Sequence, residues 1–416
     1  MSRLFIIAAI AATYFIFAIL LNSVGTVILQ SINSFDVSKT EASTLEAFKD
    51  LSIAFVSFAV ASFIPRLGYR FAMLLALVGV SLACFVTPIF ESFLAVKLLF
   101  AAIGVSFAFV KVSVYSIVGQ LSTDTDSHSS LLNTIEGIFM LGVLSGYWIF
   151  AWFIDNENPA SLSWLQVYYP LAGVILLAAL VVFFAPIAAP PVKDEQTSVW
   201  RDFVDMLKLT YKPLVLVFVI SIFLYVLIEQ GIGTWLPTFN NQILHLPSHI
   251  AVQMTSIFAA MIAIGRLSAG QILRFINWYP FLNICLALMA LAIIVTLPLA
   301  TDLTNVPIDS IFDAPLAAFL LPLAGLMMAP LYPVINSVML SSLPVYQHSQ
   351  MTGLIVVFSA LGGTTGSVVT GALFDALGGQ TAFYLSLVPI GLIMLSLVFF
   401  RRLSNAQKRE VELGAV

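Results

Sequence analysis

The stretch LFIIAAIAATYFIFAILLNSVGTVILQ, residues 4–30, decides the fold class of this chain. It carries no charged side chain, and as a helix rising 1.5 Å per residue it would extend about 40 Å, more than a hydrocarbon layer of roughly 30 Å. It is longer than the apolar core of a signal peptide, and no small-residue cleavage site is evident near its end. We therefore predict a retained membrane-spanning helix.

The rest of the chain repeats this pattern. Of its 416 residues, 60% are hydrophobic and 9% are charged, which excludes a water-soluble domain. The apolar runs are also too long for the short alternating strands of an outer-membrane barrel. The predicted fold class is an all-α membrane protein with 12 transmembrane helices. They are expected at residues 5–30, 47–65, 70–90, 94–118, 131–153, 165–186, 213–237, 249–272, 278–299, 314–340, 350–374 and 380–400.

These segments fall into two groups of six, separated by the only long hydrophilic stretch between helices. The predicted domains are an N-terminal six-helix bundle (1–186), a cytoplasmic linker (187–212), a C-terminal six-helix bundle (213–402) and a cytoplasmic tail (403–416). Residues 199–209 are predicted to form a short amphipathic helix on the membrane surface.

Lysine and arginine in the short loops predict the orientation. If the N-terminus is cytoplasmic, most basic residues lie on the cytoplasmic side, whereas the opposite side collects Asp155, Glu157, Asp302, Asp309 and Asp313. We therefore expect a multi-pass protein of the bacterial inner membrane, with both termini cytoplasmic. Nothing in the sequence indicates its oligomeric state, and a monomer is the expectation.

Enzyme chemistry is not indicated. The sequence has no nucleotide-binding loop, nucleophile elbow or metal-ligand spacing, so we expect no catalytic residues, metal or cofactor. Cys84 and Cys285 lie inside apolar segments, where burial as small hydrophobes is favoured over a disulfide. No basic stripe indicates nucleic acid as a partner.

The two halves share sequence features at equivalent positions. Gly142 and Gly146 in the fifth segment correspond to Gly362 and Gly366 in the eleventh, and small residues four apart allow helix backbones to approach closely. The turn at residues 65–70 likewise matches residues 265–270. This indicates a duplicated six-helix unit, an arrangement in which transporters place a binding cavity between the halves.

The chain resembles the major facilitator superfamily over essentially its whole length. Residues 65–70 are similar to its Gly-x-x-x-Asp-Arg-x-Gly-Arg signature, retaining Arg66, Gly68 and Arg70 without the acidic member. The resemblance implies a gating role for these three residues and for Arg266 in the second half.

Three stretches resemble the fucose permease-like (fucose–galactose–glucose) branch of that superfamily. They are residues 131–139, residues 225–237 and residues 329–336. The family's permeases use carboxylates in helices 1 and 4 for proton coupling and sugar binding. Here helix 1 offers Asn22 without a carboxylate and helix 4 offers Lys111, so the resemblance does not carry over proton–fucose symport unchanged.

Lys111 and Glu136 are the first candidates for a functional site. A charged side chain at the centre of a membrane helix costs roughly 2.5–3.5 kcal/mol, so such residues usually face a partner, a substrate or a cavity. Counting residues from the predicted helix ends, at 1.5 Å per residue, places both side chains in the cytoplasmic third of neighbouring helices. They are predicted to form a substrate or ion-coupling site; a structural ion pair, and for Lys111 snorkelling to the interface, are the alternatives.

Glu229 is the next candidate, for substrate binding and ion coupling. Gln230 follows it, and two glycines permit local unwinding of helix 7 before Trp235, so a gate that binds sugar hydroxyls is predicted. An interfacial aromatic belt is the alternative for Trp235.

Other polar residues complete the predicted inventory. Glu46, Lys49 and Asp50 are expected to form a charge network on the surface of helix 2, with an ion-coupling site at Asp50 as the alternative. Further candidate substrate ligands are Asn22, Tyr115, Asn133 and Asn336. Hydrogen bonding between helices is the alternative for Asn22 and Asn336, and a core aromatic is the favoured alternative for Tyr115.

The expected function is ion-coupled symport of a small hydrophilic solute, a sugar or sugar derivative, with protons or sodium as the coupling ion. Alternatives are transport of an anionic solute such as a uronate with Lys111 as counter-charge, efflux, or a non-transporting membrane sensor. The partners are the solute, the ion and the lipid bilayer.

Overall fold

The computed structural model describes residues 2–122, 125–188, 204, 206–300, 308–343 and 348–412. The chain divides into two compact units, Met1–Val199 and Trp200–Val416. The division falls inside the predicted linker at 187–212. Most of that linker, with the start of the predicted surface helix at 199–209, lies outside the described residues.

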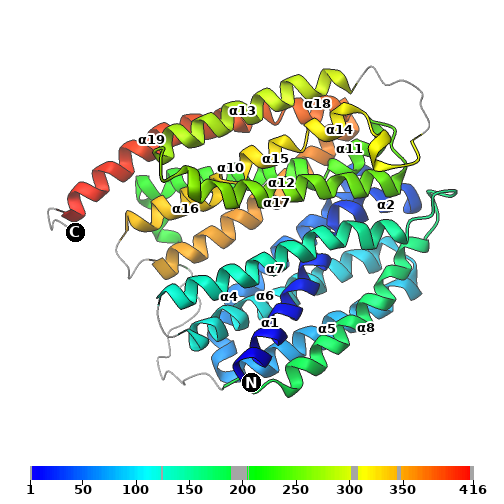
Figure 1. Ribbon diagram of the computed structural model, residues 1–416, viewed down its shortest axis with the longest axis horizontal. Coiled ribbons are helices and arrows are strands. Elements are labelled where there is room, and N and C mark those ends of the chain that lie inside the picture. Colours follow the sequence, from blue (N-terminus) through cyan, green and yellow to red (C-terminus); the bar gives the residue numbers. More distant parts are fainter. Residues whose placement is uncertain are drawn as a thin grey trace. The chain divides into compact units, whose positions relative to one another are not determined.

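The first unit is built from helices that the sequence predicts as membrane spans (Figure 1). In chain order they are α1 (Ser2–Asn22), α2 (Val24–Phe35), α3 (Lys39–Ala42), α4 (Thr44–Leu67), α5 (Tyr69–Phe90), α6 (Phe93–Leu121), α7 (Thr125–Trp152), the 3-10 turn η1 (Ser163–Val167) and α8 (Tyr168–Phe184). Helix α1 packs against α7 and α8, and α6 packs against α4 and α5.

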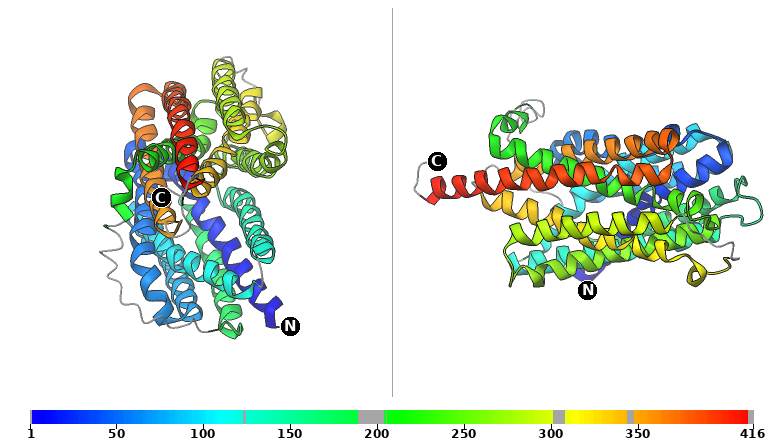
Figure 2. Two further views of the ribbon diagram at one scale, coloured as in Figure 1. Left: turned by 90° about the vertical axis from the view of Figure 1, so that its left-hand side faces the viewer. Right: turned by 90° about the horizontal axis from the view of Figure 1, so that it is seen from above.

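The second unit repeats the arrangement with more interruptions. Its elements are η2 (Leu209–Tyr211), α10 (Pro213–Gly233), α11 (Leu236–Gln242), α12 (Ser248–Ile272), α13 (Trp278–Leu299), η3 (Ile311–Asp313), α14 (Leu316–Leu320), α15 (Leu323–Met328), α16 (Leu331–Ser341), α17 (His348–Leu377), α18 (Gly379–Tyr384) and α19 (Leu387–Glu412). The long helix α19 runs beside α10 and α13 (Figure 2).

Eleven spans in the described part of the chain are long and apolar enough to cross a membrane. The twelfth is α4, whose 24 residues would rise about 36 Å. Its first turns carry Glu46, Lys49 and Asp50, which lower its hydropathy. The prediction of an all-α protein with 12 transmembrane helices is therefore confirmed.

The paired glycines produce the close helix contacts that the sequence predicts. A Cβ added at Gly142 of α7 would stand 2.8 Å from the Cβ of Ala18 on α1. In the second unit, a Cβ at Gly366 of α17 would stand 2.8 Å from the Cα of Leu227 on α10. In both units the fifth span thus packs its glycines against the first, which supports the duplication.

Several spans are interrupted, among them the first and the tenth. The first is interrupted at Ser23, between α1 and α2. The tenth is divided into α14, α15 and α16, and Pro322 and Pro330 stand at the starts of the latter two because proline cannot continue the backbone ladder.

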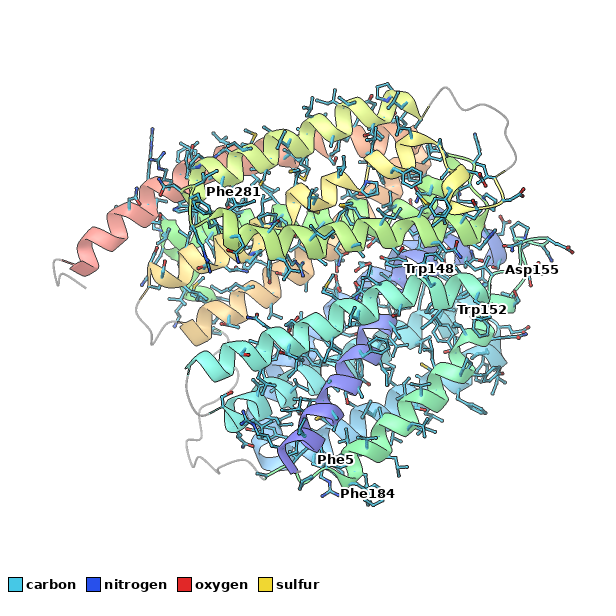
Figure 3. The ribbon with its side chains drawn as sticks, in the orientation of Figure 1. Phe5, Trp148, Trp152, Asp155, Phe184 and Phe281 are labelled. Carbon is cyan, nitrogen blue, oxygen red and sulfur yellow. The ribbon has the colours of Figure 1, made fainter. Side chains whose placement is uncertain are left out.

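The two ends of the first unit carry different side chains. Phe5 and Phe184 lie at one end, whereas Trp152 and Asp155 lie at the other (Figure 3). Arg70 joins the first group through the ring of Phe183, 5.2 Å from its guanidinium carbon. Arg70 and Asp155 thus lie at opposite ends of this unit.

Both cysteines are buried and free, as expected for small hydrophobes in a packed core. Large apolar side chains such as Phe55 and Leu94 are exposed instead, on the outer faces of α4 and α6. In a membrane-spanning bundle these faces meet lipid.

Candidate functional site

Glu229 is the centre of a polar network inside the second unit. The hydroxyl of Tyr225 donates a hydrogen bond of 3.0 Å to its Oε1 atom. Nη2 of Arg266, on α12, lies 3.3 Å from the same oxygen. Tyr225 stands one turn before Glu229 on α10, so both side chains share a helix face. The carboxylate is therefore held by one neighbour on its own helix and one on the next.

Two more helices extend this network. The ring of Tyr332, on α16, lies 5.6 Å from that of Tyr225. Its hydroxyl is 3.4 Å from Oγ of Ser359 on α17. Asn336 follows one turn later on α16, and its buried Oδ1 has no hydrogen-bond partner among the described residues. Carboxylate, guanidinium, hydroxyl and amide groups thus gather on α10, α12, α16 and α17.

The network is accessible in part. The side chain of Glu229 is 21% exposed and that of Arg266 is 43% exposed. A carboxylate and a guanidinium provide strong, directional hydrogen-bonding partners, and tyrosine rings offer flat apolar faces. This combination suits a ligand with several hydroxyl groups.

The position of Arg266 corrects the sequence analysis. Residues 265–270 are not a turn but part of α12, and the chain leaves this helix only at Leu273. Residues 65–70 do contain a turn, in which Gly68 ends α4 with a φ of 87°. The two stretches therefore share residue types but not conformation. Arg266 contacts Glu229 from within a membrane span.

Helix 7 also differs from its prediction. Helix α10 stays regular through Gln230 to Gly233, and the short break falls at Thr234 and Trp235. A Cβ at Gly231 would lie 2.8 Å from Oγ1 of Thr370, so this glycine allows close packing against α17 rather than unwinding. Oε1 of Gln230 accepts a hydrogen bond from Thr234, one turn along.

Trp235 is neither a sugar ligand nor a belt residue in this structure. Its side chain is fully buried, its indole nitrogen donates 2.9 Å to the backbone oxygen of Ser367, and its ring stacks on Phe374. The sequence could not indicate this burial, because the partners come from α17, more than a hundred residues later. Both predicted roles for Trp235 are corrected to that of a packing anchor.

Lys111 and Glu136 lie near each other in the first unit without forming a close ion pair. Glu136 accepts a hydrogen bond of 3.0 Å from the hydroxyl of Tyr115. Nζ of Lys111 lies 5.9 Å from the ring centre of Phe107, and no acidic side chain of the described residues lies within 4.0 Å of it. Tyr115 is itself 37% exposed, so it is not the core aromatic that the alternative interpretation favoured.

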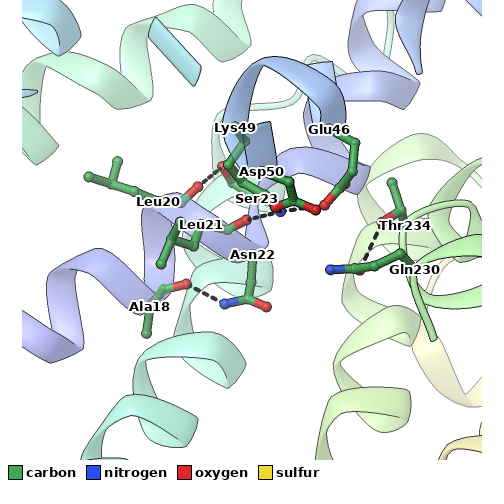
Figure 4. Close-up of polar contacts among 10 residues, drawn as sticks. All are labelled: Ala18, Leu20, Leu21, Asn22, Ser23, Glu46, Lys49, Asp50, Gln230 and Thr234. Atoms are coloured by element: carbon green, nitrogen blue, oxygen red, sulfur yellow. Dashed lines mark hydrogen bonds and ion pairs between the residues drawn. The ribbon is translucent and has the colours of Figure 1, made fainter. Parts of the chain in front are cut away.

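The charges of α4 are buried, which corrects the predicted surface network. Nζ of Lys49 lies 2.5 Å from Oε1 of Glu46 and 3.5 Å from Oδ1 of Asp50. The side chain of Glu46 is fully buried, that of Lys49 is 6% exposed and that of Asp50 is 13% exposed. Lys49 also donates 3.5 Å to the backbone oxygen of Leu21 (Figure 4).

The remaining predicted residues are dispersed. Nδ2 of Asn22 donates 2.9 Å to the backbone oxygen of Ala18, at the end of α1 (Figure 4). Asn133 is exposed on α7. Arg70 donates to the backbone oxygen of Phe183, whereas the side chain of Arg66 lies outside the described part of the structure.

Several participants were missed by sequence reasoning. Tyr225 could have been found from its spacing of four to Glu229 on one helix face. Tyr332 and Ser359 carry no such local signal, because only the packing of α16 and α17 brings them to the network. No group of three His, Cys, Asp or Glu side chains in the described ranges could hold a metal ion.

Two units of packed membrane spans, each holding charged side chains in its interior, define a polytopic membrane protein. The chain belongs to the Major Facilitator Superfamily, whose sequence profile matches residues 10–321. It is therefore a transporter of a small-molecule substrate rather than an enzyme. Comparison with curated protein sequences gives no significant match.

Solved transporters share the fold at low sequence identity. A variant of the nucleoside transporter NupG is 13% identical with a TM-score of 0.76, covering 96% of this chain and 100% of its own. A bacterial homologue of the human lysosomal transporter Spinster, inward-facing and occupied, is 14% identical with a TM-score of 0.73, covering 98% and 97%. The transporter FucP, in the outward conformation, is 15% identical with a TM-score of 0.63, covering 96% and 99%.

Proposed function

We propose that this chain is a secondary active symporter that moves a small hydroxyl-rich solute, a sugar or sugar derivative, together with a coupling ion. The observation that carries the proposal is the network around Glu229, in which Tyr225, Arg266 and Tyr332 place polar groups and aromatic faces inside a membrane-spanning unit. The resemblance of residues 225–237 and 329–336 to fucose permease-like proteins supports it. These two stretches contain Glu229, Tyr225 and Tyr332.

The network favours a sugar over a purely apolar cargo. An ionised carboxylate beside a guanidinium remains costly in a membrane unless its hydrogen bonds are satisfied. A polyol supplies donors to the carboxylate and acceptors to the guanidinium, whereas an apolar drug supplies neither. A nucleoside also carries a sugar, so the likeness to NupG is compatible with this class of solute.

The test is uptake into proteoliposomes of a labelled panel containing L-fucose, D-xylose, D-glucose, uridine and D-glucuronate, with imposed proton or sodium gradients. We expect gradient-driven accumulation of at least one panel member. Glu229→Gln should lower that uptake at least tenfold, because Arg266 then loses its charged partner. Glu157→Gln, on an exposed loop, is the matched control. Absence of flux for every panel member would refute the proposal.

A second candidate is transport of an anionic solute, with Lys111 as its counter-charge. It is favoured by one observation. Glu136, the carboxylate predicted to pair with Lys111, accepts a hydrogen bond from Tyr115, while Nζ of Lys111 has no acidic side chain of the described residues within 4.0 Å. Uptake of D-glucuronate that exceeds uptake of D-glucose and is abolished by Lys111→Ala would select this candidate. Uptake of neutral sugars that survives Lys111→Ala would reject it.

The setting that we propose is the bacterial inner membrane, with both termini cytoplasmic and the chain acting as a monomer. The support is the separation of basic Arg70 from acidic Asp155 between the two ends of the first unit. A C-terminal reporter enzyme that is active only in the cytoplasm would check this orientation.

A further inference from the structure

Helix α19 carries a row of exposed apolar side chains that ends in an arginine. The members of the row recur at intervals of four and three residues, so they share one helix face. They are Val388, Leu392, Leu395 and Phe399. Arg402 follows three residues later on the same face and is exposed as well. A guanidinium group therefore stands at the end of an apolar surface.

Helix α13 packs beside α19 and carries a row of the same kind (Figure 1). Its exposed apolar side chains have the same spacing along the helix. They are Ile284, Leu288, Leu291 and Val295. In a membrane-spanning bundle, exposed rows of this length meet the acyl chains of lipids. Two neighbouring helices thus present apolar faces to the membrane.

Aromatic side chains mark the membrane boundary at one end of both helices. Trp278 and Tyr279 begin α13, and their ring centres lie 5.7 Å apart. The ring of Trp278 also lies 5.9 Å from that of Phe400 on α19. Tryptophan and tyrosine concentrate at the depth of lipid headgroups. The polar residues that follow Phe400 therefore enter the headgroup region.

These polar residues begin with two arginines. Cζ of Arg401 lies 4.5 Å from the ring centre of Tyr279, and Arg402 is the end of the apolar row. Arg274, in the connection that leads into α13, adds a third exposed guanidinium at this end. Among the described residues, no acidic side chain lies within 4.0 Å of any of the three. This end of the second unit therefore has positive charge that the described side chains leave unbalanced.

The first unit provides a useful contrast. There, Arg70 of the third span lies over the ring of Phe183 of the sixth span, and it donates to the backbone oxygen of Phe183. In the second unit, Arg401 of the twelfth span lies over Tyr279 of the ninth. The side-chain N–H groups of Arg401 and Arg402 donate to no acceptor among the described residues. Their donors remain available to a ligand.

We propose that Arg274, Arg401 and Arg402, here named the arginine patch, bind the headgroup of an anionic phospholipid whose acyl chains lie on the exposed rows of α13 and α19. The phosphate supplies the negative charge that balances the patch. A guanidinium presents paired N–H donors that match phosphate oxygens, and stacking on Tyr279 orients the group of Arg401. This inference concerns a membrane lipid rather than the transported solute, so it stands apart from the proposed symport.

The apolar rows favour a lipid over free phosphate. A phosphate ion would contact only the arginines, which are exposed to water and to its salt, and surface charge pairs of this kind are weak. A phospholipid also places its chains against α13 and α19, and its headgroup is held at the depth where Trp278 and Tyr279 lie. The two interactions act on one molecule and reinforce each other.

The experiment is native mass spectrometry of the purified full-length chain in detergent, titrated with phosphatidylglycerol and, separately, with zwitterionic phosphatidylcholine. Each arginine near a charged headgroup contributes about fivefold to affinity. We therefore expect the double variant Arg401→Gln/Arg402→Gln to bind the first phosphatidylglycerol about thirtyfold more weakly than the wild type. Its affinity for phosphatidylcholine should stay unchanged, because that headgroup carries no net charge.

Two comparisons separate lipid binding from a change in folding. Arg402→Gln removes no described contact and should weaken phosphatidylglycerol binding about fivefold, whereas Arg401→Lys/Arg402→Lys keeps both charges and should retain most of the affinity. Arg3→Gln is the matched control, since it removes one exposed arginine from the first unit and should leave this affinity at the wild-type value.

Three results would overturn the inference. One is equal affinity of the wild type and Arg402→Gln for phosphatidylglycerol. Another is equal affinity of the wild type for phosphatidylglycerol and phosphatidylcholine. The third is displacement of phosphatidylglycerol by an equal concentration of sodium phosphate, which would assign the patch to free phosphate. None of these results bears on solute uptake, so each is distinguishable from a failure of the proposed function.

Discussion

Replacing Gly142 with alanine tests whether close packing of the first and fifth spans organises the first unit. The added Cβ would stand 2.8 Å from the Cβ of Ala18 and 3.1 Å from the backbone carbon of Phe15. Ordinary carbon contacts are about 3.5–4.0 Å, so α1 and α7 must separate by about 1 Å. Overpacking of this kind costs about 1–3 kcal/mol.

This cost predicts a measurable change. For a unit of about 200 residues, a loss of 1–3 kcal/mol corresponds to a drop in melting temperature of roughly 2–12 °C. The displacement also moves Glu136, which stands on α7, so solute uptake should fall together with stability. A thermal-shift assay on the purified protein in detergent, followed by uptake into proteoliposomes, measures both effects.

The control lies on the same helix. A Cβ added at Gly137 meets no atom within 4 Å, so Gly137→Ala should melt within 1 °C of the wild type or slightly above it. Equal melting temperatures for the two variants would refute the argument that Gly142 is required for helix approach. The same result would weaken the inferred duplication, because Gly366 contacts α10 in the corresponding way.

Four further variants test the assignments of single side chains. Trp235→Phe keeps an aromatic ring but removes the hydrogen bond to α17. The free energy of unfolding should fall by about 1 kcal/mol in a thermal melt, while the KM for uptake stays unchanged. A large rise in KM at normal stability would restore Trp235 as a ligand. Tyr115→Phe removes the donor to Glu136 and should lower uptake about threefold to tenfold, whereas an unchanged rate would show that this hydrogen bond is structural. Lys111→Ala and Glu136→Gln should each reduce gradient-driven uptake, and unchanged uptake in both would remove them from the site.

The fold was largely predictable because hydropathy and length act locally. The predicted span at 278–299 matches α13, and that at 249–272 matches α12 to one residue. The errors occurred where helices continue past a turn signal: residues 265–270 look like a basic glycine turn, yet they stay helical because their side chains pack and pair within the unit.

The candidate site was predictable only in part. Charged residues within apolar segments identified Glu229, Lys111 and Glu136, since the cost of charge in hydrocarbon is visible in any sequence. Their partners were not predictable, because Arg266 reaches Glu229 from the next span and Tyr332 arrives from a span about a hundred residues later.

By itself, the sequence determined that this chain crosses a membrane with helices in two related halves, because the bilayer imposes length and apolarity on each span independently. Only the tertiary structure decided which polar groups meet. It buried Glu46, Lys49 and Asp50 of α4, which looked like a surface network, and it buried Trp235, which looked like a ligand. Burial and pairing depend on which helix faces become neighbours, and that is settled by packing between distant spans rather than by the residues of any one span.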